Sequence, residues 1–473
     1  MNWNELLSNK RIRTSNRPLE DDPRNDFESD FGRVIFSPAT RRMHDKTQVF
    51  PLTSDDNTHS RLTHSLEVMA VGHSLGLKVC EDKYFQEITG RNEADLYRQI
   101  PVLLKNACLV HDIGNPPFGH FGETVIQNYF EIFFKGQEGK KVRKKKLIEN
   151  GDIEASEKIK IINIEGDALL DFTKFDGNAQ GFRVLTKLQI LDDDKGLNLT
   201  SATLGSYLKY PNTGSLEKEK LNKKKRGVFQ SEKKYLDEIA LNCGLFINKE
   251  IKRHPLCFLM EAADSICYLV MDLEDGFNKG WYDFDFIKKS FLKIPGLKEE
   301  FDNLEKKHCT NGVEITRMAN FRIYLIRELV KTASKNFLKY LDKICKGTYN
   351  EELIFDDKRG LAKCLQDFSL NVIFPKRPIT SLELTGHSVL TGLLDFYIEF
   401  IFHDDKQYRK RAAGLISNGI KRVALIENGL SENDSIDKLN DYFKLRIIVD
   451  FISGMTDQFA LNHYQKLSGQ KII

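Results

Sequence analysis

One short stretch of the sequence, residues 109–123, combines titratable side chains with an apolar setting. His111 and Asp112 are adjacent at the end of an apolar run, and a Gly/Pro turn follows them. Beyond the turn, His120 stands three residues before Glu123. Imidazole and carboxylate groups bind divalent metal ions, and a histidine beside a carboxylate can transfer protons. We therefore hypothesise that the first pair binds a metal and that the second pair carries out proton chemistry beside it.

A buried His-Asp pair also has a purely structural interpretation, in which the carboxylate orients a core imidazole by a hydrogen bond. Two further residues favour a metal site instead. His64 faces inward on a preceding predicted helix, and Asp264 is an acid on a later buried helix. Two imidazoles and two carboxylates suit Mn, Fe, Ni, Co or Mg better than they suit a cysteine-rich structural zinc site. Such groups are also costly to bury together without a cation.

The composition is that of a soluble globular protein. The chain has 473 residues, of which 41% are hydrophobic and 29% are charged, so it can bury one large core or several. No apolar run is long enough to cross a bilayer, and the N-terminus lacks the layout of a signal peptide, so we expect a cytoplasmic protein without membrane contact. The eight cysteines form no CxxC pair, and a net charge of +3 does not by itself indicate a nucleic-acid partner.

The elements that carry the candidate ligands are predicted to be helices. Residues 58–79 place His64 and several later apolar residues at helical spacing, which puts His64 on the inward face. Residues 100–111 form a second, nearly all-apolar helix that the Gly/Pro turn ends, and residues 121–134 form a third. The second pair of titratable residues, spaced i and i+3, would lie on one face where this third helix begins.

Residues 256–273 are predicted to form another long, buried helix. Four polar residues form a stripe along it at helical spacing: Glu261, Asp264, Tyr268 and Asp272. Burying a polar group without a hydrogen-bond or charge partner is energetically costly, so we expect a partner for this stripe.

The fold class that follows is mainly α, because alternating strand patterns are scarce. We divide the chain into an extended N-terminal arm over residues 1–35, a catalytic core over 36–283, and a helical part over 284–473 packed on that core. We expect less regular secondary structure in a basic insertion around residues 135–253.

Local signals mark several further helices. Ser37 is a plausible cap and Pro38 suits the first position of a helix that follows the arm. In the C-terminal part, amphipathic helices are predicted over residues 315–341, 361–374, 384–402 and 442–463.

Together these residues resemble a known family. The order of His64, the His111-Asp112 pair and Asp264 is similar to the H…HD…D pattern of the HD phosphohydrolase superfamily. The chain more closely resembles deoxynucleoside triphosphate triphosphohydrolases of the dGTPase type. Segments similar to that family's signatures occur in its order at residues 46–49, 61–64, 111–123, 177–181, 207–211 and 454–457. The resemblance covers nearly the whole chain and implies a helical HD-domain core with additional C-terminal helices.

The resemblance implies a catalytic mechanism. It implies a divalent ion, Mn or Mg, at four ligands: His64, His111, Asp112 and Asp264. Such an ion would polarise the α-phosphate of a dNTP and lower the pKa of a bound water, so that deoxynucleoside and tripolyphosphate are released. His120 would protonate the leaving 5′-oxygen, while Glu123 would orient the imidazole and raise its pKa. The alternative for His120 is that it only caps the helix after the turn.

The resemblance also implies seven substrate contacts. These are Arg61 at the phosphates; Gln48, Val49, Tyr268 and Asp272 around the sugar; and Asn178 and Lys209 on the phosphate or metal side. The four residues around the sugar would recognise the 3′-hydroxyl and pack against C2′, which would exclude a ribose 2′-hydroxyl. The alternative is ordinary hydrogen bonding inside a helical core or, for Arg61, a solvated helix charge.

Two basic runs, residues 140–146 and 223–226, are typical of solvated surface. Lys225 and Arg226 lie where the family has a Lys-Gly-aromatic stretch. Contact with a triphosphate or with single-stranded DNA is therefore an alternative for these runs.

The main hypothesis is a metal-dependent dNTP triphosphohydrolase that prefers dGTP and acts as a homo-oligomer. One alternative is another HD phosphohydrolase that acts on different nucleotides or phosphodiesters, and the implied 3′-hydroxyl pocket weighs against it. A second alternative is a nucleic-acid-binding regulatory protein with a residual site, which would not need the His-Glu pair. The sequence leaves open the base preference, the metal, the oligomer size and regulation by a second nucleotide or DNA.

Overall fold

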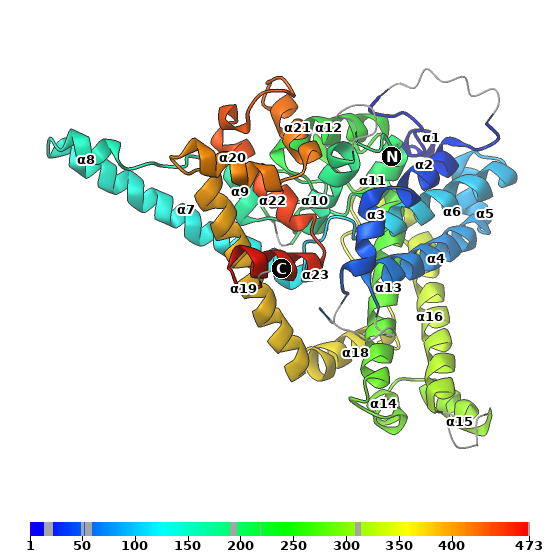
Figure 1. Cartoon of the computed structure of the whole chain (residues 1–473). Coiled ribbons are helices and arrows are strands. Elements are labelled where there is room, and N and C mark those ends of the chain that lie inside the picture. The colour runs from blue at the N-terminus through cyan, green and yellow to red at the C-terminus, as the bar shows by residue number, and fades with distance from the viewer. Residues whose placement is uncertain are drawn as a thin grey trace.

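The computed structural model describes residues 1–13, 22–48, 52, 59–189, 196–217, 219–307 and 314–471. This part of the chain is predominantly helical (Figure 1), and the prediction of a mainly α fold is confirmed. The only strands found there, β1 (Phe246–Ile247) and β2 (Glu250–Ile251), pair as one short antiparallel hairpin. Among the described residues, no helix combines the length and apolar character that crossing a bilayer would require.

Three long helices form the centre of the protein: α4 (Arg61–Cys80), α6 (Glu93–Val110) and α13 (Pro255–Asn278). The close contact of α4 with α6 requires small residues on α4. A Cβ at Gly72 would lie 2.3 Å from Sγ of Cys108, and a Cβ at Gly76 would lie 2.7 Å from the backbone of Pro101. The helices predicted over residues 58–79, 100–111 and 256–273 are thus present, with their ends moved by a few residues.

The first 35 residues differ from the extended arm that we expected. Their described part contains α1 (Trp3–Leu6) and α2 (Asp26–Ile35). Asn25 and Glu28 form a reciprocal capping box that stabilises the start of α2. Apolar side chains of both helices are buried in the core: Trp3, Leu6, Phe27 and Val34. Burial of these side chains holds the segment against the rest of the protein. The sequence did not predict this contact, because most residues of the segment are polar or charged.

Short helices surround the centre. As predicted, Ser37 caps α3 (Pro38–Arg42) and Pro38 occupies its first position. The other short α-helices before α13 are α5 (Lys83–Thr89), α8 (Ile153–Glu157), α9 (Asp167–Thr173), α10 (Gly177–Arg183), α11 (Ser201–Tyr207) and α12 (Lys233–Asn242). Single turns of other helix types are η1 (Met43–Asp45), η2 (Val184–Leu188), η3 (Leu221–Lys223), η4 (Gln230–Glu232), η5 (Ser369–Ile373) and η6 (Ile436–Lys438).

The helix that begins beside the Gly/Pro turn is much longer than predicted. Helix α7 (Gly119–Glu149) has 31 residues and projects away from the rest of the chain with α8 at its tip (Figure 1). The basic run 140–146 is therefore helical, whereas we expected order to weaken from residue 135. Lys, Arg, Gln and Glu are good helix formers, and Lys141 and Lys145 pair with acids one turn away.

The C-terminal helices pack into two hydrophobic clusters. Helices α14 (Phe284–Phe291), α15 (Leu297–Lys307), α16 (Glu314–Lys339), α17 (Leu341–Cys345) and α18 (Leu361–Phe368) contribute to the cluster that contains the central helices. Helices α19 (Arg377–Ile401), α20 (Lys406–Leu415), α21 (Asn418–Glu427), α22 (Asp441–Ser453) and α23 (Asp457–Leu467) form a second cluster with α7 and α9. The division of the chain at residues 35 and 283 stays a prediction.

The last predicted helix, over residues 442–463, is divided in two. Helix α22 ends at Ser453, and α23 begins at Asp457 with Thr456 as its cap. Gly454 and the side-chain cap of Thr456 favour a break in the helix, although the apolar periodicity continues across it.

A buried ionic network joins α10 to the C-terminal helices. The guanidinium of Arg183 is fully buried and pairs with three acids: Glu232 at 2.6 Å, Glu427 at 2.7 Å and Asp450 at 2.8 Å. Lys187 and Arg446 pair with the same acids, so three cations face three anions. This balance is needed because an uncompensated buried charge is very costly.

Substitution of Arg183 tests this network. Arg183→Ala should lower the free energy of unfolding by about 3–5 kcal/mol, because it leaves buried acids without a cation. Arg143→Ala, at an exposed position on α7, is the matched control and should change stability by no more than ~0.5 kcal/mol. Denaturant unfolding followed by circular dichroism measures both, and equal effects would contradict the assigned role of the network.

Candidate active site

The four predicted metal ligands come together from three helices. His64 lies on α4, His111 and Asp112 follow α6 directly, and Asp264 lies on α13. One donor atom each of His64, His111 and Asp112 lie within 4.8 Å of one another. Oδ1 of Asp264 is 3.3 Å from Nε2 of each histidine. The site therefore forms where the three central helices meet.

Local structure directs His111 at this site. The residue caps the carboxyl end of α6, and its Nδ1–H donates a hydrogen bond to the backbone oxygen of Cys108 at 2.8 Å. This bond leaves Nε2 directed toward the site. Nε2 makes no well-directed hydrogen bond within the described part of the chain. A buried ring nitrogen without a well-directed hydrogen bond is available to bind a metal ion.

The charges at the site are strongly coupled. Burial disfavours the charged form of His111, but Asp112 and Asp264 outweigh it and raise the pKa of His111 to about 9. Burial likewise opposes ionisation of Asp112, yet Arg61 and His111 hold its pKa well below the usual range. Two ionised carboxylates and two imidazoles make a mixed oxygen and nitrogen donor set, so these residues fit a divalent cation.

His120 and Glu123 lie on one face at the start of α7, as predicted. Nδ1 of His120 is 3.3 Å from Oε2 of Glu123, and the His120 side chain is 74% exposed. The carboxylate of Glu123 raises the pKa of His120. The other oxygen of Glu123 accepts a hydrogen bond from the backbone N–H of Gly177 at 2.8 Å. The imidazole is thus held from the buried side and faces solvent with its other nitrogen.

A cation and a second acid complete the surroundings of Glu123. Nζ of Lys225 lies 3.5 Å from Glu123 and 2.8 Å from Asp176. Burial raises the pKa of Glu123, but His120 and Lys225 outweigh it and lower the value to about 2. Glu123 is therefore ionised at neutral pH.

Arg61 lies between the metal group and the acid pair. Its guanidinium is buried and pairs with the carboxylate of Asp112. Gly119, with a left-handed φ of +60°, allows this placement, because a Cβ there would lie 2.4 Å from the guanidinium. The arginine therefore contacts both ends of the turn that separates Asp112 from His120.

Lys209 and Asn178 also lie at this site. Nζ of Lys209 is 3.5 Å from Glu261 and 3.7 Å from Asp264, on the metal side. The side chain of Asn178 donates to Asp176 at 2.8 Å, beside Lys225 and therefore on the side of the acid pair.

The residues predicted around the sugar are partly described. Tyr268 and Asp272 follow Asp264 on successive turns of α13, so the predicted stripe is present. Asp272 is buried, and burial together with Asp275 raises its pKa to about 8. The side-chain oxygen of Gln48 is buried and has no hydrogen-bond partner within the described ranges. Val49 lies outside the described residues.

The sequence patterns did not single out two acids at the edge of the site. Glu352 accepts a hydrogen bond from the hydroxyl of Ser265 at 3.4 Å, and burial together with Glu261 raises its pKa. No motif surrounds Glu352, and only the fold brings it near α13. Asp457 contacts the Gly/Pro turn, and its only signal was its position in a family-like segment.

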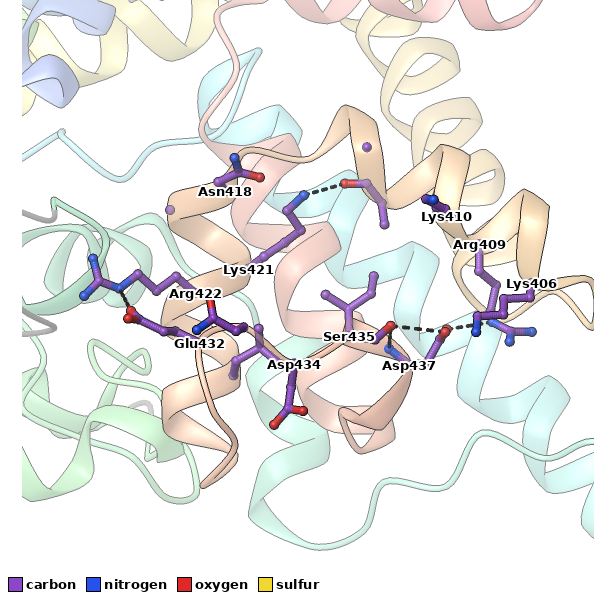
Figure 2. Close-up of a pocket in the computed structure, with 16 residues that line it drawn as sticks. Lys406, Arg409, Lys410, Asn418, Lys421, Arg422, Glu432, Asp434, Ser435 and Asp437 are labelled. Carbon is purple, nitrogen blue, oxygen red and sulfur yellow. Dashed lines mark hydrogen bonds and ion pairs between the residues drawn. The ribbon is translucent and has the colours of Figure 1, made fainter.

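A separate cavity of about 970 Å³ lies between α20, α21 and the loop after α21 (Figure 2). Three acids on its wall have cationic partners: Asp437 with Arg409, Glu432 with Arg422, and Asp434 with Lys438. Lys421 donates to the backbone oxygen of Ala413 at 2.9 Å. The cavity contains none of the predicted site residues, so it is distinct from the candidate active site.

The chain is similar to known proteins along nearly its whole length. A family model described as an HD domain matches residues 61–166, and one described as a phosphohydrolase-associated domain matches residues 429–466. The deoxyguanosinetriphosphate triphosphohydrolase-like protein of Listeria innocua is 34% identical, over 99% of this chain and all of that protein. The corresponding Synechocystis protein is also 34% identical, over 99% of both chains. The deoxyguanosinetriphosphate triphosphohydrolase of Yersinia pseudotuberculosis is 30% identical over 93% of both chains. The chain carries an HD domain and belongs to the deoxyguanosinetriphosphate triphosphohydrolase family.

Proposed function

We propose that this protein is a metal-dependent hydrolase that cleaves dNTPs, with a preference for dGTP, into deoxynucleoside and tripolyphosphate. One observation carries the proposal: the candidate metal ligands meet beside one end of a single turn, the His-Glu pair lies at its other end, and Arg61 contacts both ends. The names of the relatives support dGTP as the substrate. The alternatives are an HD phosphohydrolase for other nucleotides and a regulatory nucleic-acid-binding protein.

The metal would be held by His64, His111, Asp112 and Asp264. A bound divalent ion, Mn or Mg in our proposal, supplies Lewis-acid polarisation of a phosphate oxygen and lowers the pKa of a water molecule. Without metal, the raised pKa of His111 keeps its imidazole protonated at neutral pH. An imidazole must be neutral to act as a ligand, so metal binding would release this proton.

His120 would act as the general acid. Water adds to the α-phosphorus, the bond from phosphorus to the 5′-oxygen breaks, and the imidazolium of His120 gives its proton to that oxygen. Glu123 keeps the imidazole oriented and favours its protonated form. The exposed position of His120 leaves its second nitrogen free to meet a substrate.

Cations from three segments would neutralise the triphosphate. Arg61 lies between the metal group and the acid pair, Lys209 on the metal side, and Lys225 beside Glu123. A triphosphate carries several negative charges, and buried or half-buried cations attract it more strongly than solvated ones. Asn178, which contacts Asp176, would add a polar contact on the same side as Lys225.

The sugar would lie between the Gln48 segment and α13. Gln48 offers a buried oxygen without a partner in the described residues, and Val49 would pack against C2′. Tyr268 is half-buried one turn after Asp264, and Asp272 follows one turn later. A close apolar and aromatic contact at C2′ would exclude a ribose, whose 2′-hydroxyl needs space and a hydrogen bond.

Further partners are part of the proposal. We propose a homo-oligomer, a cytoplasmic location and an anionic effector, either a second nucleotide or single-stranded DNA, and the family likeness supports them. The basic run 140–146 on the projecting end of α7 supports binding of an anion, because most of its charges are exposed.

Product analysis is the first test of the proposed reaction. Incubation with each dNTP and Mn²⁺ or Mg²⁺ should yield deoxynucleoside and tripolyphosphate in equal amounts, fastest with dGTP. Chromatography of the nucleosides and of the inorganic products measures both. Release of pyrophosphate or orthophosphate would overturn attack at the α-phosphorus, and activity on ribonucleotides alone would overturn the sugar assignment.

Substitution of the acid pair tests the proton transfer. His120→Ala should lower kcat by about 10²–10⁴-fold while metal content stays unchanged. In the wild type, kcat should fall as pH rises through the pKa of His120, because the acid must carry a proton. Glu123→Gln removes the charge that raises this pKa, so the fall should occur at lower pH. An unmoved pH profile would contradict the role of Glu123.

Metal analysis tests the ligand set. Asp264→Ala should weaken metal binding by more than ~100-fold, beyond the effect usual for residues outside the ligand set. Asp272→Asn, on the same helix, is the control: it should keep the metal and raise KM for the dNTP instead. Metal content after dialysis distinguishes the two, and an unchanged content in Asp264→Ala would remove that residue from the set.

A further inference from the structure

A buried carboxylate of the C-terminal part contacts two segments of the candidate active site. Asp457 is the first residue of α23 and is only 2% exposed. Its Oδ2 accepts hydrogen bonds from the backbone N–H of Thr47 at 3.0 Å and from the Thr47 hydroxyl. Its Oδ1 accepts a hydrogen bond from the backbone N–H of Phe118 at 2.9 Å. We call this set of contacts the Asp457 bridge.

The two segments that meet at the bridge have different tasks in the proposed reaction. Thr47 precedes Gln48, which we assign to the sugar. Phe118 lies in the turn between the metal ligands and the acid, two residues before His120. Phe118 has a φ of +64°, a left-handed conformation that a side-chain-bearing residue rarely adopts without support. The hydrogen bond from its N–H to Asp457 supplies such support.

A neighbouring lysine strengthens the same connection. Nζ of Lys46 is buried and donates to the backbone oxygens of Asn115 at 2.6 Å and Ser453 at 2.8 Å. The backbone oxygen of Lys46 accepts from the N–H of Arg61 at 2.8 Å. The chain around residue 46 is thereby tied to the turn, to the start of α4 and to the end of α22.

We propose that Asp457 is a positioning residue: it holds the sugar-side segment and the turn before His120 in one geometry without touching the substrate. This proposal rests on the proposed function, because the two segments that Asp457 holds are those that we assign to the sugar and to the general acid. Its physical basis is the number of acceptors, since one carboxylate serves three donors from two segments, and charge-assisted hydrogen bonds are about twice as strong as neutral ones. An amide in its place offers one acceptor oxygen and directs an N–H₂ group at the remaining donors.

Kinetics of two variants test the bridge. Asp457→Asn should lower kcat by up to about 100-fold, because the turn before His120 loses its fixed geometry. Thr47→Val removes only the hydroxyl donor on the sugar side, so KM for the dNTP should rise about tenfold with kcat nearly unchanged. The matched control is Asp405→Asn, which removes a helix-capping carboxylate of α20 and should leave both constants unchanged. If Asp457→Asn leaves kcat and KM unchanged, as expected for the control, the proposal is overturned.

Hydrogen exchange measures the bridge without any substrate. Peptides that cover residues 46–48 and 113–119 should exchange faster in Asp457→Asn than in the wild type, and equally fast in Asp405→Asn and the wild type. Absence of this difference overturns the bridge, whatever the activity. A wild-type protein that hydrolyses no dNTP would instead overturn the proposed function, while exchange still decides on the bridge. If Asp457→Asn fails to fold, Thr47→Val tests the bridge instead. A raised KM with nearly unchanged kcat, together with faster hydrogen exchange at residues 46–48, would support the bridge, and the absence of both would overturn it.

Discussion

Buried carboxylates need cations or N–H donors, and in this protein those donors come from distant parts of the chain. Asp112 pairs with Arg61, Glu123 accepts from the N–H of Gly177, and Asp457 accepts from Thr47 and Phe118. Each of these bonds joins segments that are separated by tens to hundreds of residues. Because an uncompensated buried charge is strongly destabilising, these pairings determine how the helices around the site can meet.

The same requirement links the C-terminal helices to the candidate active site. The network around Arg183 fixes α10 against α21 and α22, and α10 presents the N–H of Gly177 that anchors Glu123. The region that matches a phosphohydrolase-associated domain contains Asp450 of this network and also Asp457. The C-terminal part therefore supports the helices of the candidate active site through charge, although it contributes none of the proposed metal ligands.

Much of the site could be read from local patterns. The His111-Asp112 pair and the i, i+3 spacing of His120 and Glu123 are features of short segments, and the structure brings His64 and Asp264 to the same place. Other features needed the folded chain. The polar sequence of residues 1–35 hid apolar side chains that pack only on a surface made elsewhere, and Glu352 reaches the site from a segment without any motif.

By itself the sequence determined the helical class, the positions of the main helices and the types of residue that can hold a metal and move a proton. These follow from periodicity and side-chain chemistry, which act over a few residues. Only the tertiary structure decided the partners of each buried charge, including the contact of Glu352 with Ser265 and the contacts of Asp457 with Thr47 and Phe118. Such features depend on which distant donor meets which acceptor, and short-range spacing carries no information about that pairing.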